Sequence, residues 1–261
     1  MMEHHKQTID KVIDHFKDDK RFLALIIGGS VAKGLEKADS DIDIMLIATD
    51  EEYKKRTVKK DYHIVLTDIC DYEGGYIDGK VYNLQYLREA ADHGSEPARF
   101  AFINSDVVIC RDPEIKKLLH EIAVYPQGDR SAKIASFHAQ VRVMLGFIFE
   151  AEKRGDKYFL VHAVKELVLF GGRMILAHNN ILFPYHKWFM HELRNAPDKP
   201  DNIVDLAETL LEKPCKANAD MFAECVLGFK DWPMPQPNEW IRFMEDSEWN
   251  WRYGRVPVQD C

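Results

Sequence analysis

The stretch Leu25-Ile26-Ile27-Gly28-Gly29-Ser30, with the later stretch Asp41-Ile42-Asp43-Ile44-Met45-Leu46-Ile47, decides the fold of this chain. The first apolar run ends in Gly-Gly-Ser. After the intervening residues Val31 to Ser40, a second apolar run begins with two carboxylates two positions apart. This pattern predicts a strand, a glycine turn, a short helix and a second strand.

Asp41 and Asp43 are expected to share one face of the second strand. Side chains alternate between the faces of a strand, so Ile42 and Ile44 would pack on the opposite face. Two carboxylates this close repel each other unless a divalent cation lies between them. Carboxylate oxygens suit Mg²⁺, which also takes oxygens from substrate phosphates.

The glycine turn supplies the features that a phosphate group needs. Gly28 and Gly29 let the backbone turn sharply and approach a ligand closely. Ser30 offers a hydroxyl and a backbone N–H near a helix start, where anions are favoured. A phosphate beside a metal ion indicates phosphoryl or nucleotidyl transfer.

At Ile27-Gly28-Gly29-Ser30 and Asp41-Ile42-Asp43, the sequence resembles the nucleotidyltransferase superfamily that includes DNA polymerase beta and kanamycin nucleotidyltransferase. That superfamily carries an apolar-Gly-Gly/Ser-Ser turn and, roughly ten residues later, Asp-x-Asp/Glu within an apolar strand. The resemblance covers about residues 22 to 110. It implies that Asp41 and Asp43 bind two Mg²⁺ ions, and that Gly29 and Ser30 hold the phosphates of a nucleoside triphosphate.

Nucleotidyl transfer also needs a third carboxylate, which completes the metal site or takes the proton of the acceptor hydroxyl. We favour Asp78, because it lies in an apolar and aromatic strand pattern over Tyr76–Leu84, next to a glycine pair. The third carboxylate should lie within about 5 Å of both Asp41 and Asp43. Lys80, on the same segment, could instead form an ion pair with Asp78 and neutralise its charge. The other candidates for the third carboxylate are Asp68, Asp71 and Glu73.

The sequence predicts two domains, an α+β nucleotidyltransferase domain with a mixed sheet over residues 1–128 and an all-α helical bundle over residues 129–261. The Pro- and Gly-bearing stretch 125–129 marks the boundary, and helical periodicity begins at Ser131. Gly171 and Gly172 fall inside a predicted helix, which is costly unless a neighbouring backbone approaches closely. The expected helices of the bundle cover about 131–154, 159–178, 184–195, 201–212 and 217–229.

Two features of the second domain bear on substrate binding. Lys187 is the candidate for a basic side chain over the triphosphate, a placement that the resemblance implies for nucleotidyltransferases with helical second domains. The segment from Trp232 to Tyr253 combines prolines with clustered aromatic residues. It is interpreted as a tail that packs on the bundle, as an aromatic wall for an organic acceptor, or as a homodimer contact.

Composition and charge argue against certain partners and cellular locations. The 261 residues carry a formal net charge of −8 and no long basic run, which argues against a nucleic-acid partner. Five cysteines without a C-x-x-C pair are typical of reduced thiols. The polar N-terminus and the absence of a membrane-length apolar run predict a cytoplasmic protein without a membrane partner.

The sequence therefore predicts a Mg²⁺-dependent nucleotidyltransferase. It would move a nucleoside monophosphate, in our interpretation AMP, from a triphosphate to a hydroxyl of a small molecule such as an antibiotic, and release pyrophosphate. The architecture is similar to that of the antibiotic nucleotidyltransferases. The alternatives are an enzyme that transfers AMP to a protein side chain, and a non-catalytic nucleotide-binding or interaction protein.

Overall fold

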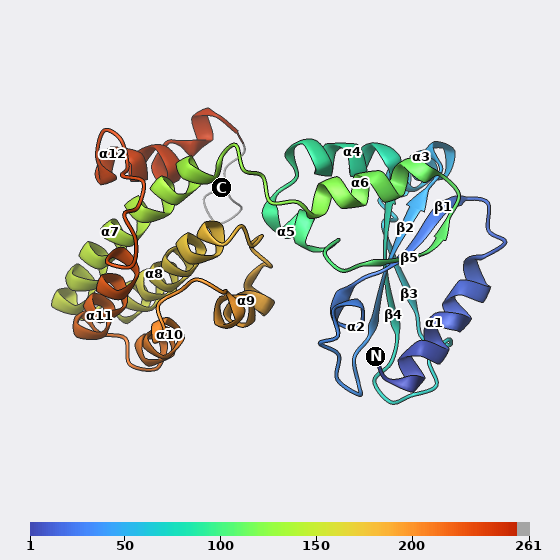
Figure 1. The fold of residues 1–261 in the computed structure, drawn as a ribbon, viewed down its shortest axis with the longest axis horizontal. Coiled ribbons are helices and arrows are strands. Elements are labelled where there is room, and N and C mark those ends of the chain that lie inside the picture. The colour runs from blue at the N-terminus through green and yellow to red at the C-terminus, as the bar shows by residue number, and fades with distance from the viewer. Residues whose placement is uncertain (255–261) are drawn as a thin grey trace. The chain divides into compact units, whose positions relative to one another are not determined.

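The structure is a computed structural model that describes residues 1–254. The chain forms two compact units, one over Met1–Tyr125 and one from Pro126 onward (Figure 1), and each is described by itself. The sequence places the boundary between residues 128 and 129. The fold class is confirmed, because a mixed sheet with helices is followed by a helical region.

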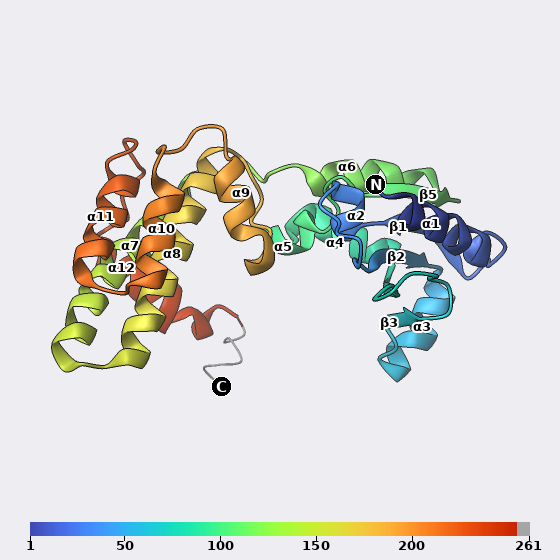
Figure 2. The ribbon, with the colours of Figure 1, turned by 90° about the horizontal axis from the view of Figure 1, so that it is seen from below.

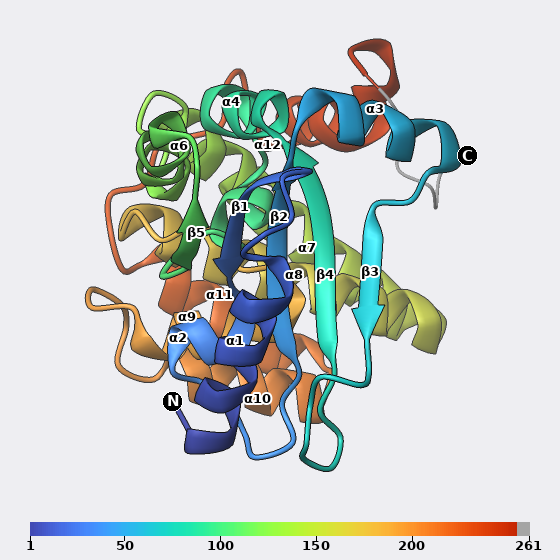
Figure 3. The same ribbon diagram turned by 90° about the vertical axis from the view of Figure 1, so that its right-hand side faces the viewer.

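Within the described residues, the first unit holds a five-stranded sheet in the order β3-β4-β2-β1-β5, which Figure 3 shows with its strands side by side. Only β2 and β4 pair in parallel, and the other neighbours are antiparallel. The strands are β1 (Phe22–Ile27), β2 (Ile42–Ala48), β3 (His63–Leu66), β4 (Ile77–Asn83) and β5 (Asp106–Cys110). The helices are α1 (Glu3–Phe16), α2 (Gly29–Lys33), α3 (Asp50–Lys59), α4 (Leu84–His93), α5 (Glu96–Phe100) and α6 (Pro113–Ala123).

Alternation along the central strands gives the sheet two apolar faces. On β1, Leu25 and Ile27 pack with α1, while Ala24 and Ile26 pack with α4 and α6. The helices therefore cover opposite faces of the sheet (Figure 1). β1 and β2 are consequently buried from both sides, which explains why both read as nearly continuous apolar runs.

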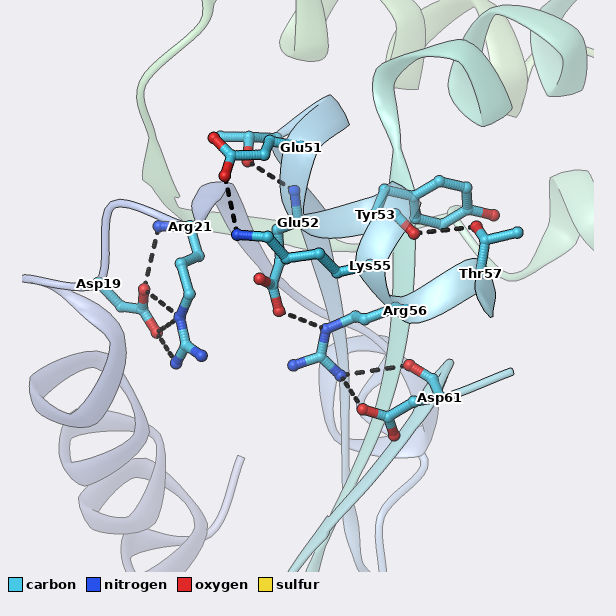
Figure 4. A network of polar contacts seen from close by, with 10 residues as sticks. Asp19, Arg21, Glu51, Glu52, Tyr53, Lys55, Arg56, Thr57 and Asp61 are labelled. Atoms are coloured by element: carbon cyan, nitrogen blue, oxygen red, sulfur yellow. Dashed lines mark hydrogen bonds and ion pairs between the residues drawn. The ribbon is translucent and has the colours of Figure 1, made fainter. Parts of the chain in front are cut away.

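A polar network fixes α3 and the chain that leads into β3 (Figure 4). Arg56 contacts Glu52 at 2.8 Å and Asp61 at 3.0 Å, and the Arg56 and Glu52 side chains are only 12% and 11% exposed. The backbone carbonyl of Asp61 also accepts a hydrogen bond from Arg56. Because Asp61 lies two residues before β3, this network anchors the chain directly before that strand.

Helix α4 is absent from the sequence-based prediction, which ended the strand at Leu84. The structure ends β4 at Asn83, whose side chain accepts a hydrogen bond from the backbone N–H of Tyr86 and caps the helix. Leu87 and Ala90 are buried against the sheet. The strand pattern thus runs directly into a helix, with Asn83 as the signal for the change.

The second unit is built on two long helices, α7 and α8, which are joined by a tight turn and pack against each other (Figures 1 and 2). The third helix begins later than predicted, because Pro184 precedes a short 3₁₀ turn, η1 (His186–Trp188), and α9 starts at Phe189. Trp232 is buried and donates to the carbonyl of Val226. The remaining elements are α7 (Arg130–Arg154), α8 (Lys157–His178), α9 (Phe189–Asn195), α10 (Ile203–Glu212), α11 (Lys216–Leu227), α12 (Glu239–Phe243), a π-helical turn η2 (Met244–Glu248) and a 3₁₀ turn η3 (Asn250–Arg252).

Two further findings bear on the sequence-based expectations. No helix among residues 1–254 combines the length and the apolar character that crossing a membrane requires. Cys70, Cys110, Cys215 and Cys225 are free thiols, and Cys261 lies outside the described residues.

The glycine pair inside α8 is explained by aromatic rings and not, as expected, by a neighbouring backbone. A Cβ atom on Gly171 would lie 2.6 Å from a ring carbon of Phe222. A Cβ atom on Gly172 would lie 2.3 Å from a ring carbon of Phe189. The missing side chains therefore let α9 and α11 pack their aromatic residues directly on the α8 backbone.

We expect Gly172→Ala to lower the free energy of unfolding by about 1–3 kcal/mol, because the added methyl group overpacks the contact with Phe189. Gly146→Ala on α7 is the matched control, since its Cβ would meet no atom within 4 Å. This control should raise stability by roughly 0.5–1 kcal/mol, as alanine favours a helix interior. Urea denaturation measures both variants, and a stabilised Gly172→Ala variant would contradict the packing described here.

Candidate functional site

Three carboxylates come together where β2 and β4 begin. These strands are parallel, and their register pairs Asp43 with Asp78, while Asp41 lies directly before β2. One carboxylate oxygen from each of Asp41, Asp43 and Asp78 lies within 4.8 Å of the others, and all three residues are half-buried. The adjacent parallel strands therefore bring together acidic residues that are far apart in the sequence.

Backbone hydrogen bonds hold this carboxylate cluster from both sides. The N–H of Gly28 donates to the carbonyl of Asp43 at 2.9 Å, which ties the glycine turn to β2. The N–H of Ile42 donates to the carbonyl of Tyr76 at 3.0 Å, which ties the start of β2 to β4. The carboxylates are thus carried by paired backbone and not by a free loop.

Gly29 lies directly against the Asp43 carboxylate. A Cβ atom on Gly29 would lie only 1.7 Å from Oδ2 of Asp43, and the φ angle of Gly29 is +64°. Both the contact and the backbone conformation therefore require glycine. Ser30 follows in the short helix α2 and is half-buried. The structure thus brings the predicted phosphate-binding turn next to the predicted metal-binding carboxylates.

The loop that leads to Asp41 is held by residues that sequence reasoning did not assign. The hydroxyl of Tyr72 donates to the carbonyl of Ser40 at 2.8 Å. The ring of His4 contacts the carbonyl of Ala38 at 3.0 Å through Nε2, and it packs on the ring of Tyr72. These contacts join α1 and the chain before β4 to the residues that precede Asp41.

His63 contacts Asp78 and was also missed by the sequence analysis. Its Nε2 atom lies 2.5 Å from Oδ1 of Asp78. The β3–β4 register pairs Val65 with Asp78 and His63 with Lys80, so the contact is diagonal across the two strands. No ion pair joins Lys80 to Asp78 among the described residues, and His63 takes the place expected for Lys80. This contact depends on the register between β3 and β4, which cannot be deduced from a single sequence.

Tyr76 extends the site toward solvent. The Asp41 carboxylate raises the pKa of the Tyr76 phenol, first through a side-chain hydrogen bond and then through its charge. The charges of Asp78 and Asp43 act in the same direction. The neutral phenol therefore faces a strongly negative cluster and is favoured as a hydrogen-bond donor.

The remaining predicted site residues lie elsewhere. Asp71 forms an ion pair with Lys11 of α1. Asp68, Asp71 and Glu73 belong to no group of three metal-binding side chains within residues 1–254. Lys187 lies in the second unit, in η1, with Nζ 5.6 Å from the ring centroid of Trp188. The roles of Asp41, Asp43 and Asp78 at the metal, and of Gly29, Ser30 and Lys187 at the nucleotide, remain predictions.

The residues of the cluster fit a hard divalent cation. Three carboxylates offer only oxygen atoms, and their spacing brings these oxygens toward one point. Oxygen donors of this kind suit Mg²⁺, Mn²⁺ or Ca²⁺ better than softer metals. A cation would also neutralise the mutual repulsion of the three charges.

A match to one family model agrees with this geometry. Residues 9–122 match the family model described as a nucleotidyltransferase domain. No curated protein matches the chain. One crystal structure that resembles it is a nucleotidyltransferase-like protein from Exiguobacterium sibiricum 255-15. That structure has 11% sequence identity and a TM-score of 0.47, and the match covers 95% of this chain and 79% of that one. The family match spans the sheet and all three carboxylates, and this similarity to a nucleotidyltransferase domain supports a transferase.

Proposed function

We propose that the protein is a Mg²⁺-dependent nucleotidyltransferase that moves AMP from ATP to a hydroxyl group of a small molecule. The observation that carries this proposal is the convergence of Asp41, Asp43 and Asp78 to within 4.8 Å, beside Gly29. Three carboxylates this close repel one another, so the arrangement is unfavourable unless a cation binds between them. A nucleotidyl transfer site needs such a cluster next to a phosphate-binding turn.

The residues divide into two groups by role. Asp41 and Asp43 would hold two Mg²⁺ ions, and Asp78 would complete the metal site. Bound Mg²⁺ neutralises the charge of the triphosphate and stabilises the attacking and leaving oxygens. Gly29 and Ser30 hold the β- and γ-phosphates, because the missing side chain at Gly29 leaves the backbone open beside Asp43.

Asp78 is the group that accepts the proton in the transfer step. The acceptor hydroxyl gives its proton to the Asp78 carboxylate as its oxygen forms a bond to the α-phosphorus. The bond between the α-phosphorus and the bridging oxygen of the β-phosphate breaks, and pyrophosphate leaves with that electron pair. The contact from His63 at 2.5 Å orients the Asp78 carboxylate for this role.

The acceptor is expected to be a small molecule such as an antibiotic. This part of the proposal rests on the similarity in architecture to antibiotic nucleotidyltransferases, with a helical unit after the nucleotidyltransferase domain. A net charge of −8 disfavours a nucleic-acid acceptor. In this proposal Lys187 contacts the triphosphate, and the reaction takes place in the cytoplasm.

We expect Asp41→Asn, Asp43→Asn and Asp78→Asn each to lower the rate of pyrophosphate release by about a thousandfold or more, because each removes several kcal/mol of transition-state stabilisation. The assay combines ATP, GTP, CTP or UTP with Mg²⁺ and a panel of aminoglycosides, lincosamides and other hydroxyl compounds. ATP should be the preferred donor.

Two rival carboxylates supply matched controls for these substitutions. Asp68→Asn and Asp71→Asn carry the same chemical change outside the cluster and should keep nearly the full rate. Pyrophosphate release that survives Asp41→Ala or Asp43→Ala would rule out the proposed mechanism. Loss of activity in Asp68→Asn together with an active Asp78→Asn variant would move the third carboxylate to Asp68.

We expect Gly29→Ala to abolish measurable transfer, because its methyl group cannot coexist with the Asp43 carboxylate in this arrangement. Gly34→Ala is the control, since Gly34 also has a positive φ of 69° but has no atom within 4 Å of an added Cβ. Gly34→Ala should lose about 1 kcal/mol of stability from backbone strain, and Gly29→Ala should lose more because its methyl group also clashes with Asp43. Steady-state kinetics and thermal melts compare the two, and equal activity would contradict the assigned role of Gly29.

A further inference from the structure

A cavity of about 360 Å³ lies within the helical unit, and the proposed transfer step does not use it. Helices α7, α8 and α12 and the turns η2 and η3 contribute its walls. Its volume falls within the range of about 300–1,000 Å³ that is usual for small-molecule sites. The described residues that line it include aromatic rings, two carboxylates and His162, but no Lys or Arg.

Three phenylalanines form the apolar part of the cavity, namely Phe147, Phe170 and Phe243. Phe147 and Phe243 meet edge to face, with ring centroids 5.7 Å apart, and Phe243 is buried. The face of an aromatic ring attracts a cation, and this attraction strengthens when water is excluded. The ring surfaces therefore suit an apolar group or a substituted ammonium group.

Two carboxylates form the charged part of the cavity. Glu166 of α8 is 17% exposed and Asp246 of η2 is 29% exposed, so both are partly removed from water. Oε1 of Glu166 contacts Lys165, and Oδ2 of Asp246 contacts Arg242. The second oxygen of each carboxylate has no hydrogen-bond partner within residues 1–254, so each retains an acceptor for a ligand.

Gln140 adds a buried polar group at the same cavity. The residue is 5% exposed, and its Nε2 donates to the hydroxyl of Ser247 at 2.8 Å. Its Oε1 accepts no hydrogen bond from the described part of the chain. Ser247 and Asp246 both belong to the π-helical turn η2, a rare conformation that is frequent at functional sites.

We propose that this cavity binds a small organic amine, in its cationic form, with the ammonium group near Glu166 and Asp246 and the apolar part against the phenylalanine rings. A cationic ligand is favoured because Glu166 and Asp246 each keep one carboxylate oxygen outside their ion pairs, and neither Lys165 nor Arg242 lines the cavity. The same two carboxylate oxygens repel nucleotides and other phosphate-bearing ligands. This site lies entirely within the helical unit and goes beyond the proposed transfer reaction.

The test uses three probes of similar size that share a phenyl group and differ in charge. They are the cation 2-phenylethylammonium, the neutral 2-phenylethanol and the anion phenylacetate. Isothermal titration calorimetry of the full chain, without nucleotide or divalent metal, measures binding apart from catalysis. We expect the ammonium probe to bind, the alcohol to bind at least about tenfold more weakly, and phenylacetate not to bind. Equal affinities for the three probes, or no binding of the ammonium probe at millimolar concentration, would overturn the proposal.

Neutral variants of the two carboxylates test whether the ammonium probe binds in this cavity. Glu166→Gln and Asp246→Asn should each weaken the binding of 2-phenylethylammonium by about three- to tenfold, with no effect on 2-phenylethanol. Glu150→Gln is the matched control, because Glu150 lies on α7 outside the cavity and pairs with Arg154. Unchanged binding in both cavity variants would also overturn the proposal. Circular dichroism melts verify that each variant folds, and the three-probe comparison needs no substitution.

Discussion

The mutual repulsion of three carboxylates is the constraint on which the first unit depends. Asp41, Asp43 and Asp78 keep oxygens within 4.8 Å of one another, although like charges at such distances raise the free energy of the folded state. The apolar burial of β1 and β2 on both faces offsets this cost and fixes the register that pairs Asp43 with Asp78. A bound divalent cation would convert the repulsion into attraction, so the arrangement makes sense as a site prepared for metal and phosphate.

Much of the first unit was predictable from local patterns. The Gly-Gly-Ser turn and the alternation around Asp41 and Asp43 gave the strand, turn, helix and strand, and the aromatic strand pattern singled out Asp78. What could not be predicted depends on contacts between segments. The contact of His63 with Asp78 follows from the β3–β4 register, which no single sequence displays. Helix α4 was missed because one polar residue, Asn83, separates it from β4.

For the second unit, the sequence predicted where the helices lie but not which side chains meet between them. Periodicity located α7, α8, α10 and α11, because long amphipathic and apolar segments repeat every three or four residues. The reason for Gly171 and Gly172 lay in the rings of Phe222 and Phe189, which are distant in sequence. The cavity lined by Glu166 and Asp246 likewise combines elements that are separated by about eighty residues. The first half therefore carries its candidate site in a local motif, whereas the candidate ligand cavity of the second half arises only from packing.

The three carboxylates are expected to bind together the metal ions that serve the triphosphate. Electron paramagnetic resonance of Mn²⁺, added with a non-hydrolysable ATP analogue, measures this directly on the full chain. A pair of bound ions is expected for the unmodified protein, as in two-metal sites that act on phosphates, and the bound Mn²⁺ should be lost in the Asp41→Asn, Asp43→Asn and Asp78→Asn triple variant. Mn²⁺ binding that is unchanged in the triple variant would contradict the account.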